Sequence, residues 1–296
     1  MRIDVGQALP PANSNCPKGW QAGYPLGPPA PPFDHLAARY DALWTTTAIG
    51  RAQRNLVWRD MDTLFQPGMR ILDIGCGTGE DAAHFAARGV TVYATDASPA
   101  MVQVAQARGG FTAAVCSAED LAQIGGAFDG AISNFGTLNC VEDLPAVARS
   151  LAGLVRPGGR VAICLLGRFC AWETLYYGVR GQFGKALRRL VGHALACPSE
   201  EQSSPRAASR HSGDGKLKHA PPGIMVHYPT AAQIRAAFAP NFVLQRWTGI
   251  GLCVPPSYVK LPAALVGCLA ACDRLLARLP LLRALADHRL FLLVRK

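Results

Sequence analysis

Residues 71–82 read ILDIGCGTGEDA, in which an apolar run ending near Asp73 passes into a glycine-rich turn. The three glycines, Gly75, Gly77 and Gly79, allow a tight turn and let the backbone approach a ligand closely. A helix after this turn directs its first N–H groups into the crevice beyond the carboxyl end of the strand, where open α/β sheets bind ligands. The segment therefore predicts a strand–turn–helix unit and a ligand site.

A strand–helix rhythm surrounds this unit and predicts a parallel sheet with helices on both faces. The strands are short apolar runs, as expected when both faces of a sheet are covered. We expect strands at 69–74, 90–96, 111–116, 127–134 and 160–166, with helices at 79–89, 98–109 and 142–155. Later helices are expected at 172–196, 229–239 and 261–279, and later strands at 242–251 and 288–296. The fold class is thus α/β.

Asp96 stands at the end of the second expected strand, 17 residues beyond Gly79. A carboxylate at this place can accept two hydrogen bonds from ribose hydroxyls. Its alternative role is to cap the helix expected from residue 98. Glu80 occupies the position where the dinucleotide fingerprint has Gly or Ala, and its charge disfavours a pyrophosphate. The turn instead suits a ligand that carries sulfonium and ammonium groups.

Five short motifs follow one another along the chain: ILDIGCGTG (71–79), ATDASPAM (94–101), SAEDL (117–121), FDGAISNFGTLN (128–139) and RPGGRVAI (156–163). In this order they resemble the class I S-adenosylmethionine-dependent methyltransferases, in the subgroup of small-molecule enzymes with an LDIGCGTG motif. The resemblance implies S-adenosyl-L-methionine as the cofactor. It also implies a Rossmann-like, doubly wound, mostly parallel seven-stranded sheet with a helical lid or insertion.

The resemblance also implies a role for individual residues. The methionine part of the cofactor would lie against Asp73, Gly75, Cys76, Gly77 and Gly79. Asp96 would hold the ribose, and the adenine would lie near Ala97, Met101, Ser117 and Ala118. The methyl group would lie beside Asn134 and Phe135, and Tyr40 and Arg51 would close over the carboxylate end. The SNFG tetrad at 133–136 is not the [ND]PP[YF] sequence typical of amino-group methylation on nucleobases or amides.

Transfer of a methyl group from a sulfonium is an in-line displacement that depends mainly on proximity and alignment. A general base is optional, and His227 is the expected candidate, with packing or loop polarity as its alternative role. We expect the acceptor pocket to form from 33–58, 168–195 and 223–285, which are rich in Trp, Tyr, Phe and Leu. This composition favours a small apolar or aromatic acceptor, either lipid-like or, through the positive field, anionic.

The chain has 296 residues, of which 50% are hydrophobic and 17% are charged, so global disorder is excluded. Its net charge of +10 comes from residues 167–296, which hold 18 Lys and Arg against six Asp and Glu and so carry +12, whereas residues 1–166 carry −2. These basic residues form no aromatic-interleaved stripe, so a nucleic acid is not an expected partner. An RNA methyltransferase and a non-catalytic cofactor-binding scaffold remain the alternative functions. The helix at 261–279 is either a peripheral membrane contact or an amphipathic core helix.

The ten cysteines lie mostly in apolar runs and form no CxxC pair, which indicates buried thiols and no metal site. The first twenty residues lack an apolar signal-peptide core, and the uncharged run at 261–272 is too short to span a bilayer. These features predict a cytoplasmic protein.

Four regions are expected along the chain. Residues 1–32 are a Pro-rich tail, and 33–166 hold N-terminal lid helices followed by the cofactor-binding core. Residues 167–228 form a helical insertion, in which 197–223 read as a mobile loop, and 229–296 complete the sheet with a cap helix.

Overall fold

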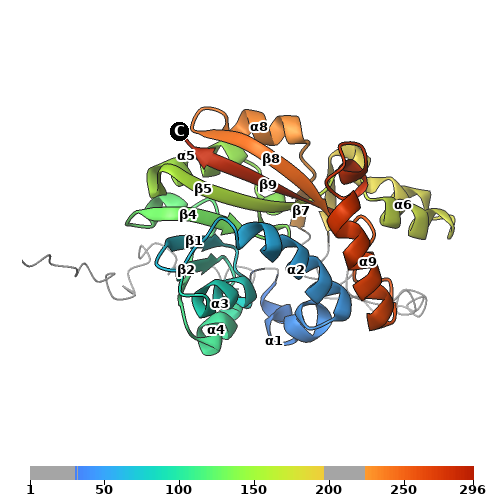
Figure 1. Cartoon of the computed structure of the whole chain (residues 1–296), viewed down its shortest axis with the longest axis horizontal. Helices are drawn as coiled ribbons and strands as arrows, with labels where there is room; N and C mark the ends of the chain where they lie inside the picture. The colour runs from blue at the N-terminus through green and yellow to red at the C-terminus, as the bar shows by residue number, and fades with distance from the viewer. Residues whose placement is uncertain (1–30, 32, 197–223) are drawn as a thin grey trace, which may run out of the picture. The chain divides into compact units, whose positions relative to one another are not determined.

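The computed structural model describes residues 31, 33–196 and 224–296 of the chain. A seven-stranded sheet forms the centre of this part (Figure 1). Its strand order is β3-β2-β1-β4-β5-β9-β8. The first five strands pair in parallel, and β9 runs antiparallel between β5 and β8. The strands are β1 (Arg70–Ile74), β2 (Thr91–Asp96), β3 (Thr112–Val115), β4 (Phe128–Ser133), β5 (Val155–Leu166), β8 (Phe242–Ile250) and β9 (His288–Arg295). This confirms the predicted Rossmann-like, mostly parallel sheet.

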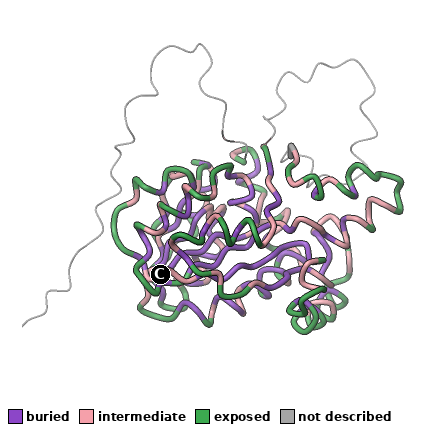
Figure 2. Tube along the Cα trace, turned by 90° about the horizontal axis from the view of Figure 1, so that it is seen from above, coloured by how far each residue is buried: buried purple, intermediate pink, exposed green. Residues whose placement is uncertain are grey.

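Both faces of the sheet are buried, because successive apolar side chains of a strand enter two different cores. Ile71 of β1 lies in one core with Phe85, whereas Leu72 lies in the other core with Phe238. The first core is covered by α2 (Ala48–Met61), α3 (Glu80–Ala87), α4 (Pro99–Arg108) and α9 (Ala263–Leu276). The second core is covered by α5 (Leu144–Leu154) and α8 (Ala231–Phe238). Figure 2 shows the buried strands between these more exposed helices.

The helix starts follow from local sequence. Ser98 caps α4, since its hydroxyl oxygen accepts a hydrogen bond from the Met101 N–H at 3.1 Å and Pro99 occupies the first turn. Thr230 and Gln233 form a reciprocal capping box at the start of α8. Before α2, the segment from residue 33 forms α1 (Ala37–Tyr40) and a π-helical turn at Asp41–Thr45. The predicted helices in the region from residue 33 are thereby confirmed.

The prediction of one helix over 172–196 is wrong. This stretch forms α6 (Ala171–Gly178), α7 (Phe183–Ala186), a 3-10 turn at Arg188–Val191 and strand β6 (His193–Ala196). Glycines break the helix, because Gly181 and Gly192 adopt φ of 70° and 98°, a region in which other residues are strained. Strand β6 pairs antiparallel with β7 (Ile224–His227), a strand that the sequence pattern did not indicate.

The turn at Pro157–Gly159 was expected to separate α5 from a strand that begins at residue 160. Strand β5 instead begins at Val155, which pairs with Phe128, and its regular register resumes at Arg160 opposite Gly130. The Pro-Gly-Gly sequence therefore forms an irregularity inside the strand.

Two predicted segments lie outside the described residues: the Pro-rich tail at 1–32, of which Pro31 alone is described, and the mobile loop at 197–223. Among the residues that the structure does describe, none belongs to a helix with the length and apolar character needed to cross a membrane.

A buried carboxylate holds the chain that leaves β8. Asp273 of α9 is 2% exposed and accepts hydrogen bonds from the backbone N–H groups of Leu252, Cys253 and Val254 at 2.9–3.1 Å. Burial raises the pKa of Asp273, and the three N–H donors oppose that shift. The segment after Val254 carries Pro256 and Tyr258, which line a cavity described below.

Replacing Asp273 with Ala should destabilise the fold, because three buried N–H groups lose a charged acceptor. We expect Asp273→Ala to lower the free energy of unfolding by about 3 kcal/mol. Urea denaturation followed by circular dichroism measures this loss. The control is Glu119→Ala, which removes an exposed acid; equal stabilities of the two variants would contradict the anchoring role.

Candidate active site

The glycine-rich turn between β1 and α3 is held against the end of β2. The N–H groups of Gly75 and Cys76 both donate to the carbonyl oxygen of Thr95, at 2.7 and 2.8 Å. Gly75 has a φ of 70°, and a Cβ at this position would lie 2.1 Å from the Thr137 side chain. Gly77 has a φ of 54° and open space where its Cβ would lie. The turn therefore presents bare backbone to a ligand.

Asp96 at the end of β2 reaches across to this turn. One carboxylate oxygen accepts the Gly77 N–H at 2.8 Å, and the other accepts the Ser98 N–H at 2.9 Å. Burial raises the pKa of Asp96, and these backbone N–H groups oppose that shift. Since the Ser98 side chain caps α4, the carboxylate of Asp96 is not needed for capping. Each oxygen keeps an acceptor position for a ligand hydroxyl.

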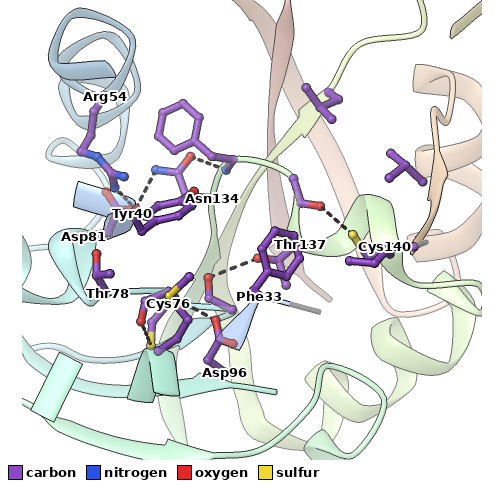
Figure 3. Close-up of a pocket in the computed structure, with 18 residues that line it drawn as sticks. Phe33, Tyr40, Arg54, Cys76, Thr78, Asp81, Asp96, Asn134, Thr137 and Cys140 are labelled. Atoms are coloured by element: carbon purple, nitrogen blue, oxygen red, sulfur yellow. Dashed lines mark hydrogen bonds and ion pairs between the residues drawn. The ribbon is translucent and has the colours of Figure 1, made fainter. Parts of the chain in front are cut away.

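A cavity of about 1100 Å³, part of it open to solvent, lies above the turn (Figure 3). Its floor is the glycine turn, with Asp96 on one side and the segment after β4 on the other. Residues from the N-terminal helices and from β7 complete it. Of the predicted site residues, it brings together Tyr40, Gly75, Cys76, Gly77, Asp96, Met101, Asn134 and Phe135. We call this space the first cavity.

An ion pair joins two walls of the first cavity. Arg54 of α2 lies 2.5 Å from Asp81 of α3, and both residues are 6% exposed. Burial opposes the charge on Arg54, but the Asp81 carboxylate raises its pKa overall. The Asn134 side-chain amide donates to Asp81 at 3.1 Å, which ties the end of β4 to the pair. Figure 3 shows the three side chains converging at one side of the cavity.

Asp73 lies beneath the first cavity with an unsatisfied oxygen. It is 1% exposed, and its Oδ2 has no hydrogen-bond partner among the described residues. Burial, and then the nearby Asp81 carboxylate, raise the pKa of Asp73 well above its ordinary value. Asp73, Asp81 and Asp96 thus place three carboxyl groups around the turn, and the Arg54 guanidinium pairs with one of them, Asp81. This surplus of acid fits a cationic ligand.

Other predicted residues do not line the first cavity. Asp73 and Gly79 lie below or behind it, Ala97 is exposed, and Ala118 is buried elsewhere. The Ser117 hydroxyl donates to Asp120 at 2.8 Å instead. Arg51 points outward and donates to the Thr46 carbonyl oxygen at 3.3 Å. Arg54, three residues later on α2, is the arginine that lines the cavity.

His227 does not lie in this cavity either. Along β7, Ile224 and Val226 line the first cavity, so the alternating His227 points to the other face of the strand. There it lines a separate cavity with His193 and Gln233. Its carbonyl oxygen accepts the Asn139 side-chain amide at 2.6 Å, a backbone role that tells nothing of catalysis.

The sequence reasoning missed several lining residues. Arg54 could have been found from helix phase, because it lies on the apolar side of α2 with Val57 and Met61, three and seven residues later. Asp81, in the first turn of α3, follows directly from the motif. Of the other lining residues, Thr78, Gly136 and Thr137 lie within the quoted motifs, and Phe33, Ile224 and Val226 lie within the ranges expected to form the acceptor pocket. Cys140 and Leu166 carry no signal in the local sequence.

A second cavity adjoins the first and shares Tyr40, Phe135 and Leu166 with it. It encloses about 700 Å³, part of it open to solvent. Phe135, in the wall between the two cavities, has a φ of 50° although it is not glycine. Such strain costs of order 1–3 kcal/mol and gathers at functional sites. The two cavities together offer room for two ligands that meet at Phe135.

Comparison with known proteins agrees with this geometry. Residues 71–159 match the family model described as "Methyltransferase domain". A demethylmenaquinone methyltransferase of Clavibacter sepedonicus is 34% identical over 139 residues, which cover 45% of this chain and 55% of that protein. A ubiquinone biosynthesis O-methyltransferase of Xanthomonas oryzae pv. oryzae is 37% identical over 107 residues, 34% of this chain and 44% of that protein. The chain spans about half the length of the curated relatives it matches.

Solved structures share the fold at low identity. The structure of a SAM-dependent methyltransferase from Thermotoga maritima, described as a possible histamine N-methyltransferase, aligns with a TM-score of 0.53 at 13% identity. The alignment covers 90% of this chain and 98% of that chain. Residues 71–159 are therefore similar to a methyltransferase domain, and the described part of the chain shares the fold of this methyltransferase structure.

Proposed function

We propose that this chain transfers a methyl group from S-adenosylmethionine to a small apolar or aromatic molecule. The observation that carries the proposal is the acid-rich first cavity, which opens beside a second cavity with aromatic walls. When bound, S-adenosylmethionine supplies a methyl group made electrophilic by a sulfonium. The chain's own contribution is to hold the two ligands in line and close together.

The residues of the first cavity fit this cofactor. Asp96 can accept hydrogen bonds from the hydroxyls of a ribose, beside the backbone N–H groups of Gly77 and Ser98 that its two oxygens already accept. The unpartnered Oδ2 of Asp73 suits an ammonium group. The bare backbone at Gly77 allows close approach. Sequence positions 97, 117 and 118 stand outside the cavity, so Met101 is the residue that supports an adenine contact.

Aromatic side chains cover the first cavity from the N-terminal helices. Burial raises the pKa of Tyr40 to about 12, with Arg54 opposing, so the ring carries a neutral phenol at physiological pH. Phe33 and Phe135 lie at the same opening. Electron-rich faces attract cations, which supports placement of the sulfonium among them.

Several basic residues of the C-terminal part bind carboxylates or carbonyl oxygens of the protein itself, which supports a small acceptor over RNA. Arg246 and Arg278 both contact Asp60, at 3.3 and 2.8 Å. Arg189 is buried between two carboxylates, and Arg295 donates to backbone carbonyl oxygens. Pairing of this kind leaves fewer cations for phosphates. The quinone-pathway names of the relatives agree with a lipid-like or aromatic acceptor.

We further propose that the chain contacts anionic membrane surfaces. Within 174–192 and 263–285 the one acidic residue, Asp273, is buried, so every exposed charge is basic. These two ranges also hold most of the large exposed apolar side chains: Leu175, Val179, Phe183, Leu187, Leu190, Val191, Leu265, Leu275, Leu276, Leu279, Leu281 and Leu285. Apolar and basic groups together fit an anionic lipid surface.

The cofactor site predicts binding of S-adenosylhomocysteine, the product left after transfer. We expect Asp96→Ala to weaken this binding by about 1–3 kcal/mol, or roughly 5- to 150-fold, because charged hydrogen bonds are lost. Isothermal titration calorimetry measures both affinities. Glu142→Ala, which removes an exposed acid outside the first cavity, is the control. Absence of binding to the native chain would refute the proposed function.

Binding should also depend on pH through Asp73. In the free protein the raised pKa keeps part of the Asp73 carboxyl groups protonated at pH values at which an ordinary carboxyl group is ionised. An ammonium group of the ligand favours the ionised form of Asp73. Ligand binding should therefore release protons, and affinity should increase as the pH rises through that raised pKa. Calorimetry in buffers of different ionisation enthalpy counts the protons. Asp73→Asn should abolish the release; an unchanged proton count would show that Asp73 does not meet the ligand.

The membrane contact predicts sedimentation with vesicles of phosphatidylglycerol and phosphatidylcholine, but weaker sedimentation with phosphatidylcholine alone. Leu275 and Leu281 are 76% and 85% exposed, so Leu275→Glu with Leu281→Glu should reduce the bound fraction at least about fivefold without unfolding the chain. Val115→Glu changes an equally apolar, 55% exposed residue outside these ranges and is the control. Equal losses in both proteins would argue against a specific surface.

A further inference from the structure

The second cavity lies where the antiparallel strand β9 begins. His288 is the first residue of β9 and pairs with Leu166, the last residue of β5. Because β9 runs against its neighbours, its first residue comes to the edge of the sheet at which the parallel strands end. This places His288 beside Phe135, with ring centroids 5.4 Å apart in an edge-on arrangement. His288 thus borders the wall shared by the two cavities.

Four aromatic side chains line part of the second cavity, beside polar and charged groups. Trp44 and Phe135 meet edge to face at 4.5 Å, and Tyr40 and Tyr258 also line the cavity. Rings arranged in this way favour a flat aromatic ligand, because edge-to-face and offset contacts add to the burial of its surface. The Tyr258 hydroxyl is buried without a hydrogen-bond partner among the described residues. Burial raises the pKa of Tyr258, so this hydroxyl stays protonated and can donate to a ligand oxygen.

The charged groups of the second cavity neutralise one another. Arg189 is 6% exposed and donates to Glu173 at 2.7 Å and to Asp287 at 2.9 Å. Arg188 donates to the other oxygen of Glu173 at 2.9 Å. Two guanidinium groups therefore face two carboxylates, and no charge is left over for a ligand. A cavity whose charges are compensated favours a neutral acceptor. This differs from the anionic acceptor that the positive net charge of the chain suggests.

Asp287 lies beside the imidazole of His288, although Nδ1 of His288 has no hydrogen-bond partner among the described residues. Its Oδ2 lies 3.3 Å from Nδ1 of His288, and its Oδ1 accepts from Arg189. Burial opposes ionisation of Asp287, but His288 and Arg189 lower its pKa overall, so it stays a carboxylate. His288 is 7% exposed, and burial lowers its pKa, which leaves the imidazole neutral at physiological pH. A neutral imidazole next to a carboxylate is suited to accept a proton, because the carboxylate stabilises the positive charge that forms.

We propose that the second cavity binds a neutral phenol-type acceptor and that His288, with the Asp287 carboxylate beside it, is the general base for its hydroxyl proton. The inference rests on the proposed function. In the step, the acceptor O–H proton moves to His288 and the oxygen forms a bond to the methyl carbon. The methyl–sulfur bond breaks with its electron pair remaining on sulfur, which becomes a neutral thioether. The Tyr258 hydroxyl positions the acceptor oxygen.

Several ionisable groups face His288 from the elements around it. They are Asp287 on its own strand, Arg188 and Arg189 from the 3-10 turn, Glu173 from α6, Tyr258 from the loop before α9, and Tyr40 from α1. Among these, Asp287 lies 3.3 Å from the imidazole, and the positive charge of Arg189 helps to lower the pKa of His288. The test below therefore compares acceptors of different acidity at one pH and does not depend on a pH profile.

Two acceptor probes separate a base from a residue that only shapes the cavity. At pH 8, 4-nitrophenol is already ionised in water, whereas phenol keeps its proton. We expect His288→Gln to slow methyl transfer to phenol about 100-fold, which is the contribution of a general base, and transfer to 4-nitrophenol less than about fivefold. The matched control is His227→Gln. It alters a histidine that lines neither the first nor the second cavity and should leave both rates unchanged. Equal loss with both phenols would overturn the base role.

A binding measurement gives a second readout that needs no turnover. With S-adenosylhomocysteine present near neutral pH, 4-nitrophenol should bind to the native chain as the phenolate, seen by its visible absorbance. It should bind to His288→Gln as the neutral phenol. Tyr258→Phe keeps the shape of the cavity and should weaken this binding about tenfold while leaving S-adenosylhomocysteine affinity unchanged. Thermal melts of each variant confirm that it is folded.

The outcomes distinguish this inference from the proposed function. If S-adenosylhomocysteine binds but neither phenol binds or is methylated, the proposed acceptor class is overturned and the cofactor site is retained. Failure of S-adenosylhomocysteine to bind would overturn both. An identical absorbance spectrum of 4-nitrophenol on the native chain and on His288→Gln would remove His288 as its proton acceptor.

Discussion

The buried ion pair between Arg54 and Asp81 connects the parts from which the site is built. Arg54 belongs to α2, and Asp81 lies in the first turn of α3, just after the glycine turn. Trp58 also donates to Asp81, at 2.6 Å, so both carboxylate oxygens have partners. On its other side, the Arg54 guanidinium lies over the rings of Trp44 and Phe135, 4.7 and 5.0 Å from their centroids. Removal of either partner would leave a buried charge, a loss of about 3–5 kcal/mol.

This pair has consequences for both cavities. Through Asp81 it sets the start of α3 and the end of β4 around the first cavity, and through Trp44 and Phe135 it sets the wall of the second. The first cavity keeps a surplus of carboxyl groups that suits a cation, whereas the charges of the second cavity are compensated by Arg188 and Arg189. The chain thereby offers a cationic and a neutral ligand separate places that meet at one strained residue, Phe135.

The features that the sequence predicts correctly depend on neighbouring residues. The glycine turn, the position of Asp96 and the Ser98 cap all follow from a few consecutive side chains, and all stand where the pattern places them. The choice of Arg51 over Arg54 fails because both lie on one helix, and which of them faces inward depends on the packing of α2.

The residues of the second cavity lie beyond local prediction for a related reason. His288 becomes relevant only because β9 inserts antiparallel between β5 and β8, and its partner Leu166 is far away in sequence. The split of the region 172–196 into short helices and a strand depends on β7, which lies beyond a long intervening segment. Strand alternation then directs Val226, and not His227, into the first cavity.

The central claim is that the acid-rich cavity above the glycine turn holds the cofactor. A crystal structure of the chain grown with saturating S-adenosylhomocysteine tests it most directly. The account predicts density in the first cavity, with the ribose hydroxyls on Asp96, the ammonium on Asp73 and the sulfur facing Phe135. Density at another place, or a first cavity filled only by solvent at saturating ligand, would contradict it.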